Sequence, residues 1–264
     1  MQVRFRGVRG SVAWSVPEAQ GHGCNTACIE IVDERTGAVL ILDAGSGIVG
    51  VSPDVADVPV LLTHYHWDHI LGLPSFAPLF RADRRVTLYA PTLEAYDDAW
   101  FDTLLRAPFF PISQEALPKA PSHVAAGPGP VAVPGFDVRA LALNHPGGAL
   151  AYRVGGAGGD IVYATDHEFG DPAYDEPLGA FASGAAAVVL DAHFTPEERL
   201  RHRGWGHSDW RQCAEFARAH GVAALYLFHH KPGRTDDELT AIEQAARCTF
   251  PSTHTAREGH VFTI

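Results

Sequence analysis

Short apolar runs, several of which end directly in Asp or His, constrain the fold of this chain most. Their length, composition and flanking turn residues are typical of buried β-strands. They cover residues 27–32, 38–42, 58–63, 86–90, 149–154, 161–164, 187–190 and 223–228. The strand-end residues are Asp43, His64, Asp166, Asp191 and His229. Because α/β folds build their sites along one edge of a sheet, this pattern predicts an α/β fold with ligand-type side chains gathered at one edge.

Helix signals are clearest in the second half of the chain. Thr235 and Glu238 form a capping box before a helical pattern, and Thr195 opens a short helix. Ser208 is the expected N-cap of a helix over 210–220 that ends at Gly221, and residues 92–105 have an amphipathic helical pattern. The Gly- and Pro-rich segments 118–134 and 155–159 are expected to be surface connections. We therefore predict one domain over residues 1–264.

The composition limits the classes of partner. The 264 residues include 20 Lys and Arg against 31 Asp and Glu, a formal charge of −11. A broad nucleic-acid surface needs clustered cations, so this balance argues against one, although a small anionic substrate is allowed. The sequence has no apolar run long enough to span a membrane and no secretory signal pattern, so we expect a cytoplasmic protein without a membrane partner. The 4 cysteines are expected to be free thiols.

The segment His64-Tyr-His66-Trp-Asp68-His69 carries the strongest chemical signal, and it follows directly on the predicted strand 58–63. Side chains two residues apart share a face of extended backbone, so His64, His66 and Asp68 can converge. His69 joins them if the chain turns into a helix. Imidazoles and a carboxylate suit a divalent ion such as zinc, and their crowding is compatible with two neighbouring ions. A surface patch of titrating histidines is the alternative, which the strand-end position disfavours.

Further ligands must come from later strand ends. His145 lies in the turn Asn144-His-Pro-Gly-Gly148, Asp166 follows the run 161–164, and His229 follows the run 223–228. Each residue alone would more often be a turn or surface residue. Together with the first motif they supply a His/His/His set and an Asp/His/His set, with one carboxylate left to bridge them.

On these residues, the sequence resembles the metallo-β-lactamase-fold hydrolases over nearly its whole length. The HxHxDH motif is His64, His66, Asp68 and His69, and His145, Asp166 and His229 follow in the family's order. Other segments resemble the phosphodiesterase branch, which includes RNase Z and cyclic-phosphate phosphodiesterases: Phe5-Arg-Gly-Val-Arg-Gly-Ser11, Gly23-Cys-Asn-Thr26, Ile41-Leu-Asp43-Ala-Gly-Ser-Gly47 and His69-Ile-Leu-Gly-Leu-Pro74. The resemblance implies an α/β fold of the four-layer αββα sandwich type.

The resemblance also implies a role for each ligand. One metal ion would be held by His64, His66 and His145. The second would be held by Asp68, His69 and His229, with Asp166 bridging the two ions. His230 directly follows His229 and competes for its role, and His229 is preferred as the first residue beyond the strand. Asp166 stands where some β-lactamases carry Cys, which argues against their activity.

Two divalent ions bridged in this way suit phosphodiester hydrolysis, because they activate water as hydroxide and offset charge on phosphate oxygens. Zinc is the default for a His-rich site, and manganese or iron also fits. Asp68 would orient the hydroxide while serving as a ligand. The leaving oxygen needs a proton, and His207, in a Gly-His-Ser segment that resembles the branch, is the first candidate donor. His193 is expected to contact the substrate phosphate, and Asp191 would orient either histidine.

The leading hypothesis is therefore a dinuclear metal phosphodiesterase for a small or cyclic phosphodiester. A thioester or lactone hydrolase on the same scaffold and a metal-binding sensor without turnover are the alternatives. RNase Z proteins carry a basic, Gly-rich arm for tRNA, and this acidic sequence has no comparable segment, so no long nucleic acid is expected as a partner. The stretches Trp100-Phe101 and Phe109-Phe110-Pro111 are expected in the core or at a homodimer contact rather than as a cleft wall.

Overall fold

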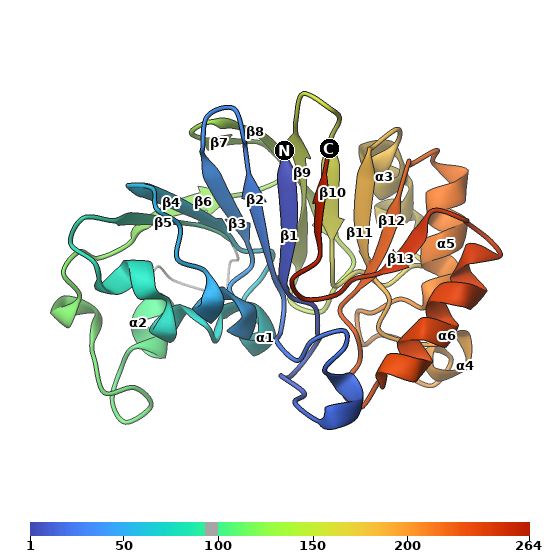
Figure 1. The fold of residues 1–264 in the computed structure, drawn as a ribbon, viewed down its shortest axis with the longest axis horizontal. Helices are drawn as coiled ribbons and strands as arrows, with labels where there is room; N and C mark the ends of the chain where they lie inside the picture. Colours follow the sequence, from blue (N-terminus) through green and yellow to red (C-terminus); the bar gives the residue numbers. More distant parts are fainter. Residues whose placement is uncertain (93–99) are drawn as a thin grey trace.

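The chain folds around two mixed β-sheets that lie face to face (Figure 1). A computed structural model describes residues 1–92 and 100–264. The first 7-stranded sheet has the order β14-β1-β2-β3-β4-β5-β6, and the second has the order β13-β12-β11-β10-β9-β8-β7. Strands of the first sheet are β1 (Gln2–Gly7), β2 (Cys28–Val32), β3 (Val39–Leu42), β4 (Asp57–Leu61), β5 (Arg85–Pro91), β6 (Ser122–Ala126) and β14 (Val261–Thr263). Strands of the second are β7 (Gly129–Val133), β8 (Phe136–Leu143), β9 (Ala149–Gly155), β10 (Ile161–Ala164), β11 (Ala187–Asp191), β12 (Leu225–Phe228) and β13 (Thr253–Thr255).

Helices cover the outer faces of the two sheets. On the second sheet lie α3 (Pro172–Ala182), α5 (Trp210–Ala219) and α6 (Asp236–Arg247), with the short α4 (Pro196–Arg199) nearby (Figure 1). The first sheet is covered by α1 (Trp67–Ile70), α2 (Trp100–Leu104) and short 3-10 turns. These turns are η2 (Ser46–Gly50), η3 (Leu73–Ser75), η4 (Ala77–Phe80) and η5 (Gln114–Ala116). A further turn, η1 (Pro17–Ala19), lies against α6. None of the helices within residues 1–92 and 100–264 is long and apolar enough to cross a membrane.

Apolar side chains fill each space between neighbouring layers. One core lies between the sheets and includes Phe5 and Tyr163, a second joins the second sheet to its helices, and a third lies under the helices of the first sheet. Three cores between helix, sheet, sheet and helix define four layers, as the αββα prediction requires. The predicted α/β class and four-layer architecture are therefore confirmed.

The central strands agree with the sequence prediction because their residues are buried on both faces. The β3-β4-β5 and β10-β11-β12 groups are parallel, and all residues of β3, β10, β11 and β12 are buried. Such strands have continuous apolar sequences that are recognisable without knowledge of their neighbours. The capping box of α6, the start of α4 after Thr195 and the end of α5 before Gly221 are also confirmed.

Several local predictions were wrong or incomplete. Segment 118–134 was expected to be a surface connection, but it contains β6 and β7, which pair with β5 and β8. Ser208 does not cap α5: the Asp209 carboxylate accepts hydrogen bonds from the first turn, while Ser208 Oγ bonds the His167 carbonyl. The predicted helix 92–105 is observed as α2 at its end, and its positions 93–99 lie outside the described residues. Phe101 is buried in the core, as expected.

A buried hydrogen bond joins the two sheets beside the ends of their central strands. The Tyr152 hydroxyl, on β9 of the second sheet, donates to the Leu62 carbonyl, which follows β4 of the first sheet, at 2.7 Å. Tyr152 is 0% exposed, so water cannot replace the phenol as donor.

Tyr152→Phe should therefore lower the free energy of unfolding by about 1–2 kcal/mol, since it leaves a buried carbonyl without its donor. Denaturant unfolding measures the change. Tyr226→Phe, in the same core, is the matched control and should cost less than about 0.5 kcal/mol. Equal effects of the two substitutions would contradict a contribution of the inter-sheet bond.

Candidate metal centre

The ends of central strands from both sheets meet at one edge and supply most of the candidate residues. Asp43 follows β3, Asp166 follows β10 after one residue, and His229 follows β12. These three residues adopt left-handed backbone conformations, with φ of 59°, 59° and 60°. A non-glycine residue in this region costs of order 1 kcal/mol, and such strain persists only where the surrounding structure enforces it. The turn takes each side chain out of the strand alternation and into the gap between the sheets.

The motif segment reaches the same edge by changing secondary structure. His64 and His66 follow β4, His66 is in extended backbone, and α1 begins at Trp67. The first turn of α1 then places Asp68 and His69 inward, and both are buried. The expected convergence of His64, His66, Asp68 and His69 is thus observed, with His66 as the exposed member.

His64, His66 and His145 form the first group. His145 Nε2 lies 3.1 Å from His66 Nδ1, and one nitrogen from each ring lies within 4.8 Å of the others. His145 Nδ1 donates to the Gly206 carbonyl at 2.9 Å, so its Nε2 carries a lone pair. The buried His64 Nε2 has no hydrogen-bond partner in the described part of the chain.

Asp68, His69 and His229 form the second group. The two Nε2 atoms of His69 and His229 are 3.3 Å apart, and Asp68 Oδ2 lies 3.3 Å from the first and 3.0 Å from the second. His230 faces away, because its Nε2 donates to the Ala256 carbonyl at 2.9 Å. Of the two competing histidines, the structure thus places His229 in the group.

Asp166 lies between the two groups and divides its oxygens between them. Oδ1 is 4.0 Å from His64 Nε2 and 3.8 Å from His145 Nε2. Oδ2 is 3.2 Å from His69 Nε2 and 3.4 Å from His229 Nε2. The side chain is 2% exposed. The six residues of the two groups therefore surround the buried Asp166 carboxylate. These six residues and Asp166 are called the ligand cluster.

The cluster has the electrostatics of a cation site. Burial opposes ionisation of Asp68 and Asp166, yet the neighbouring imidazoles hold both carboxyl pKa values below the usual range. Burial alone would lower the pKa of His69, but three adjoining carboxylates raise it well above normal. Burial, followed by repulsion from His69, lowers the pKa of His64, which keeps it neutral. Divalent metals bind ionised carboxylates and deprotonated imidazole nitrogens, so a bound cation would replace the extra proton of His69.

Asp43 supports this set in a way that the sequence did not reveal. Its carboxylate accepts hydrogen bonds from His69 Nδ1 at 2.8 Å, the Tyr163 hydroxyl at 2.8 Å and Thr63. The bond to Nδ1 turns Nε2 of His69 toward the cluster. The backbone N–H of Ser11 likewise donates to Asp68 Oδ2 at 2.6 Å. Asp43 was recognised as a strand end and as part of a segment that resembles the phosphodiesterase branch, but without a role. The contribution of Ser11 is made by its backbone, which carries no residue-type signal.

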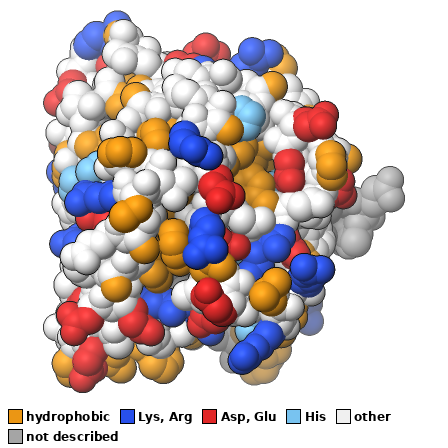
Figure 2. All heavy atoms as spheres, turned by 90° about the vertical axis from the view of Figure 1, so that its right-hand side faces the viewer, with side chains coloured by type: hydrophobic (Ala, Val, Ile, Leu, Met, Phe, Trp, Pro, Cys, Tyr) orange, Lys and Arg blue, Asp and Glu red, His pale blue; other side chains and the backbone are white. Residues whose placement is uncertain are grey.

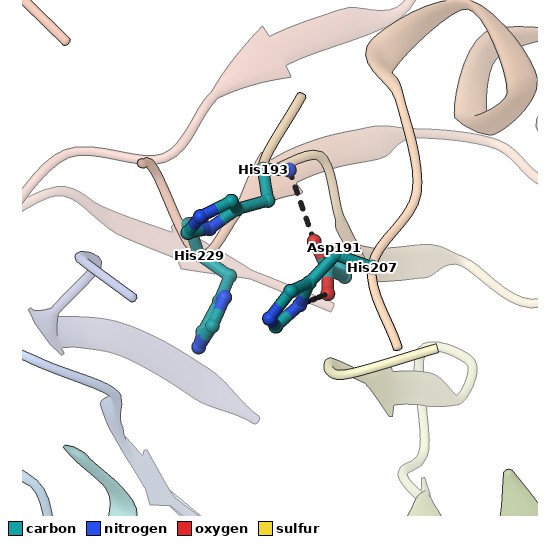
Figure 3. A group of neighbouring side chains, drawn as sticks. All are labelled: Asp191, His193, His207 and His229. Carbon is teal, nitrogen blue, oxygen red and sulfur yellow. Dashed lines mark hydrogen bonds and ion pairs between the residues drawn. The ribbon is translucent and has the colours of Figure 1, made fainter. Parts of the chain in front are cut away.

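A second group of side chains adjoins His229 (Figure 3). His207 Nδ1 bonds Asp191 Oδ2 at 2.6 Å, and the His207 ring stacks on His193 with centroids 4.5 Å apart. His193 Nδ1 donates to the His229 carbonyl at 3.0 Å. Burial would lower the pKa of His207, but the Asp191 carboxylate more than offsets this and raises the pKa to about 9. His207 therefore carries a proton at neutral pH within 3.7 Å of Asp166 Oδ1.

Asp43→Asn tests the support of His69. Asn tolerates the left-handed conformation but loses the charge that orients the imidazole, so Zn²⁺ affinity should fall about 10–100-fold. Calorimetric titration measures the change. Asp54→Asn is the matched control, because the Asp54 side chain is 100% exposed and pairs with Arg84. Unchanged Zn²⁺ affinity in Asp43→Asn would show that Asp43 does not orient His69 for metal binding.

The amino-acid sequence is similar to a known domain family and to known proteins. The profile of the Beta-lactamase superfamily domain matches residues 42–230, which include the complete ligand cluster. The chain is 37% identical over 101 residues to ribonuclease Z of Nocardia farcinica, a match that covers 36% of this chain and 30% of the relative. It is 24% identical over 310 aligned positions to ribonuclease Z of Lacticaseibacillus casei, covering 98% of this chain and 93% of that one.

Solved structures share the fold at low sequence identity. The metallo-beta-lactamase fold protein YhfI from Bacillus subtilis superposes with a TM-score of 0.73 at 19% identity, covering 99% of both chains. A diphosphatase of the PhnP family superposes with a TM-score of 0.67 at 17% identity, covering 99% of this chain and 96% of the other. At this identity the likeness establishes the fold.

Proposed function

The chain belongs to the metallo-β-lactamase superfamily, and from this premise we propose that it is a dinuclear, metal-dependent phosphodiesterase for a small or cyclic phosphodiester. The observation that carries the proposal is the division of the Asp166 oxygens between two groups of ligands. A carboxylate in this position is a natural bridge between two cations. The relatives named ribonuclease Z and the similar diphosphatase both act, by their names, on bonds to phosphorus.

The residues present fit two divalent ions. His64, His66 and His145 would hold one, Asp68, His69 and His229 would hold the other, and Asp166 would contact both. The orphaned His64 Nε2 and the facing Nε2 atoms of His69 and His229 support this fit, because lone pairs aimed at one another need a shared cation or proton. Zn²⁺ is the default, and Mn²⁺ or iron also suits the set. When bound, the two ions would activate water and offset charge on the phosphate oxygens.

The remaining side chains would orient the attacking water and donate a proton to the leaving oxygen. Asp68 Oδ2 is held by the Ser11 N–H and would orient the attacking water. His207 would protonate the leaving oxygen through Nε2, because Asp191 holds its Nδ1. His193 would line the phosphate position beside His207. Its Nδ1 hydrogen is committed to the His229 carbonyl, and burial followed by repulsion from His207 lowers its pKa, so Nε2 would accept a hydrogen bond rather than donate one.

A small substrate is favoured over a long nucleic acid. The alignment with the Lacticaseibacillus casei protein spans 310 positions, more than the 264 residues here, so that ribonuclease Z has segments without a counterpart in this chain. The face in Figure 2, which is one side of the molecule, mixes acidic and basic side chains, and the whole chain has a formal charge of −11. Polynucleotide binding depends on clustered cations.

Asp166→Ala tests the bridging role. Because the carboxylate would contact both ions, the variant should lose one of two metals per chain and also lose hydrolysis of bis(p-nitrophenyl) phosphate. Elemental analysis and a rate assay on protein purified without chelator give both readouts, and a lactone and thioester panel tests the alternative substrates. His123→Ala, an exposed position on β6, should change neither. One metal per wild-type chain, or equal losses in both variants, would refute the dinuclear proposal.

His207→Ala separates a proton donor from a metal ligand. The variant should keep its metal content and lose turnover by roughly 10²–10⁴-fold on an alkyl phosphodiester, whose leaving group needs a proton. The loss on a nitrophenyl ester should be much smaller, since nitrophenolate leaves without help. Rate measurements with both substrates and elemental analysis give the comparison. If both substrates slow by the same factor, the donor lies elsewhere.

A further inference from the structure

Two tryptophans are among the most exposed large apolar side chains of the described residues. Trp67 is 68% exposed and Trp205 is 61% exposed. Single exposed apolar residues are common and need no explanation. Their position relative to the ligand cluster is what distinguishes this pair.

Both tryptophans adjoin residues that contact the same imidazole, His145. Trp67 follows His66, whose Nδ1 is 3.1 Å from His145 Nε2. Trp205 precedes Gly206, whose carbonyl accepts a hydrogen bond from His145 Nδ1 at 2.9 Å. Each tryptophan is thus one residue away from a group that contacts one of the two nitrogen atoms of His145. His66, the exposed member of the first ligand group, shows that this group reaches the solvent.

Local structure keeps both indoles on the outside. In α1 the buried residues are Asp68, His69 and Ile70, so Trp67 occupies the solvent side of this single turn. At Gly206, φ is +82° and an added Cβ would lie 2.2 Å from His145 Nδ1, so only glycine lets the loop pass this close. Trp205, one residue earlier, is exposed and packs edge-on against His202, with ring centroids 4.8 Å apart.

We propose that Trp67 and Trp205 flank the substrate entrance and bind an aromatic substituent of the phosphodiester, such as a nucleobase or another aryl group. This inference rests on the proposed phosphodiesterase function and defines its substrate class. Indole faces stack on planar rings without regard to sequence or hydrogen-bonding pattern. The chain has a formal charge of −11, so selectivity by stacking at the entrance suits it better than capture of additional phosphates.

The test compares substrates with one leaving group and different second substituents. Benzyl, cyclohexylmethyl and methyl p-nitrophenyl phosphate all release the same nitrophenolate, and only the benzyl ester has a planar ring as its second substituent. The metal-loaded wild type should hydrolyse the benzyl ester with a kcat/KM about tenfold above the other two. Trp67→Ala and Trp205→Ala should each reduce this preference severalfold, whereas Trp67→Phe and Trp205→Phe should largely retain it.

Phe80→Ala is the matched control for removal of an exposed aromatic side chain. Phe80 is 38% exposed and ends η4, five residues before β5 begins, and it adjoins no residue of the ligand cluster in the sequence. It should leave the preference unchanged. Calorimetric binding of benzyl phosphonate against methyl phosphonate gives a second readout that does not depend on turnover, and it should follow the same order among the variants.

Each result decides a different claim. If the wild type hydrolyses none of the three esters, the proposed function fails. If it hydrolyses them without an aromatic preference, or favours benzyl and cyclohexylmethyl equally, the aromatic subsite is refuted while the phosphodiesterase proposal stands. The subsite is also refuted if the preference survives both Ala substitutions, or if the tryptophans instead hold a dimer that the double Ala variant dissociates in sedimentation analysis.

Discussion

The placement of the Asp166 carboxylate between two groups of imidazoles is the interaction on which the rest of the site depends. One oxygen faces His64 and His145 and the other faces His69 and His229, all at 3.2–4.0 Å. Such an arrangement requires ligands from both sheets and a residue that leaves its strand at a left-handed turn. The inter-sheet core and the hydrogen bond from Tyr152 to the Leu62 carbonyl hold the two halves of the cluster in register.

Residues with strong local signals were predictable from the sequence, and those with long-range roles were not. The parallel central strands and the HxHxDH segment were recognised because burial and ligand type appear in the residues themselves. The structure also brings His145, Asp166 and His229 to that segment, and it places His230 elsewhere. Strands β6 and β7 were missed because glycines and prolines resemble turns. Helix α3 was missed because Pro177 and Gly179 lie within it.

The positioning contacts show why sequence alone stops short of the complete site. Asp43 reaches His69 across 26 positions, and Gly206 reaches His145 across 61. Neither contact follows from spacing or composition, because each exists only after the sheets have packed. Both act on Nδ1 of an imidazole and thereby set the direction of Nε2, so the accuracy of the ligand geometry depends on them. The same loop that orients His145 also carries Trp205, so it connects the ligand cluster to the proposed substrate entrance.

The central claim is that two metal ions share Asp166. Anomalous diffraction from crystals grown with Zn²⁺ tests it most directly. The account predicts two peaks about 3.5–4 Å apart, one beside His64 and His145 and the other beside His69 and His229, with a carboxylate oxygen of Asp166 at each. A single peak, or a peak centred on His193 and His207 with none at Asp166, would contradict it.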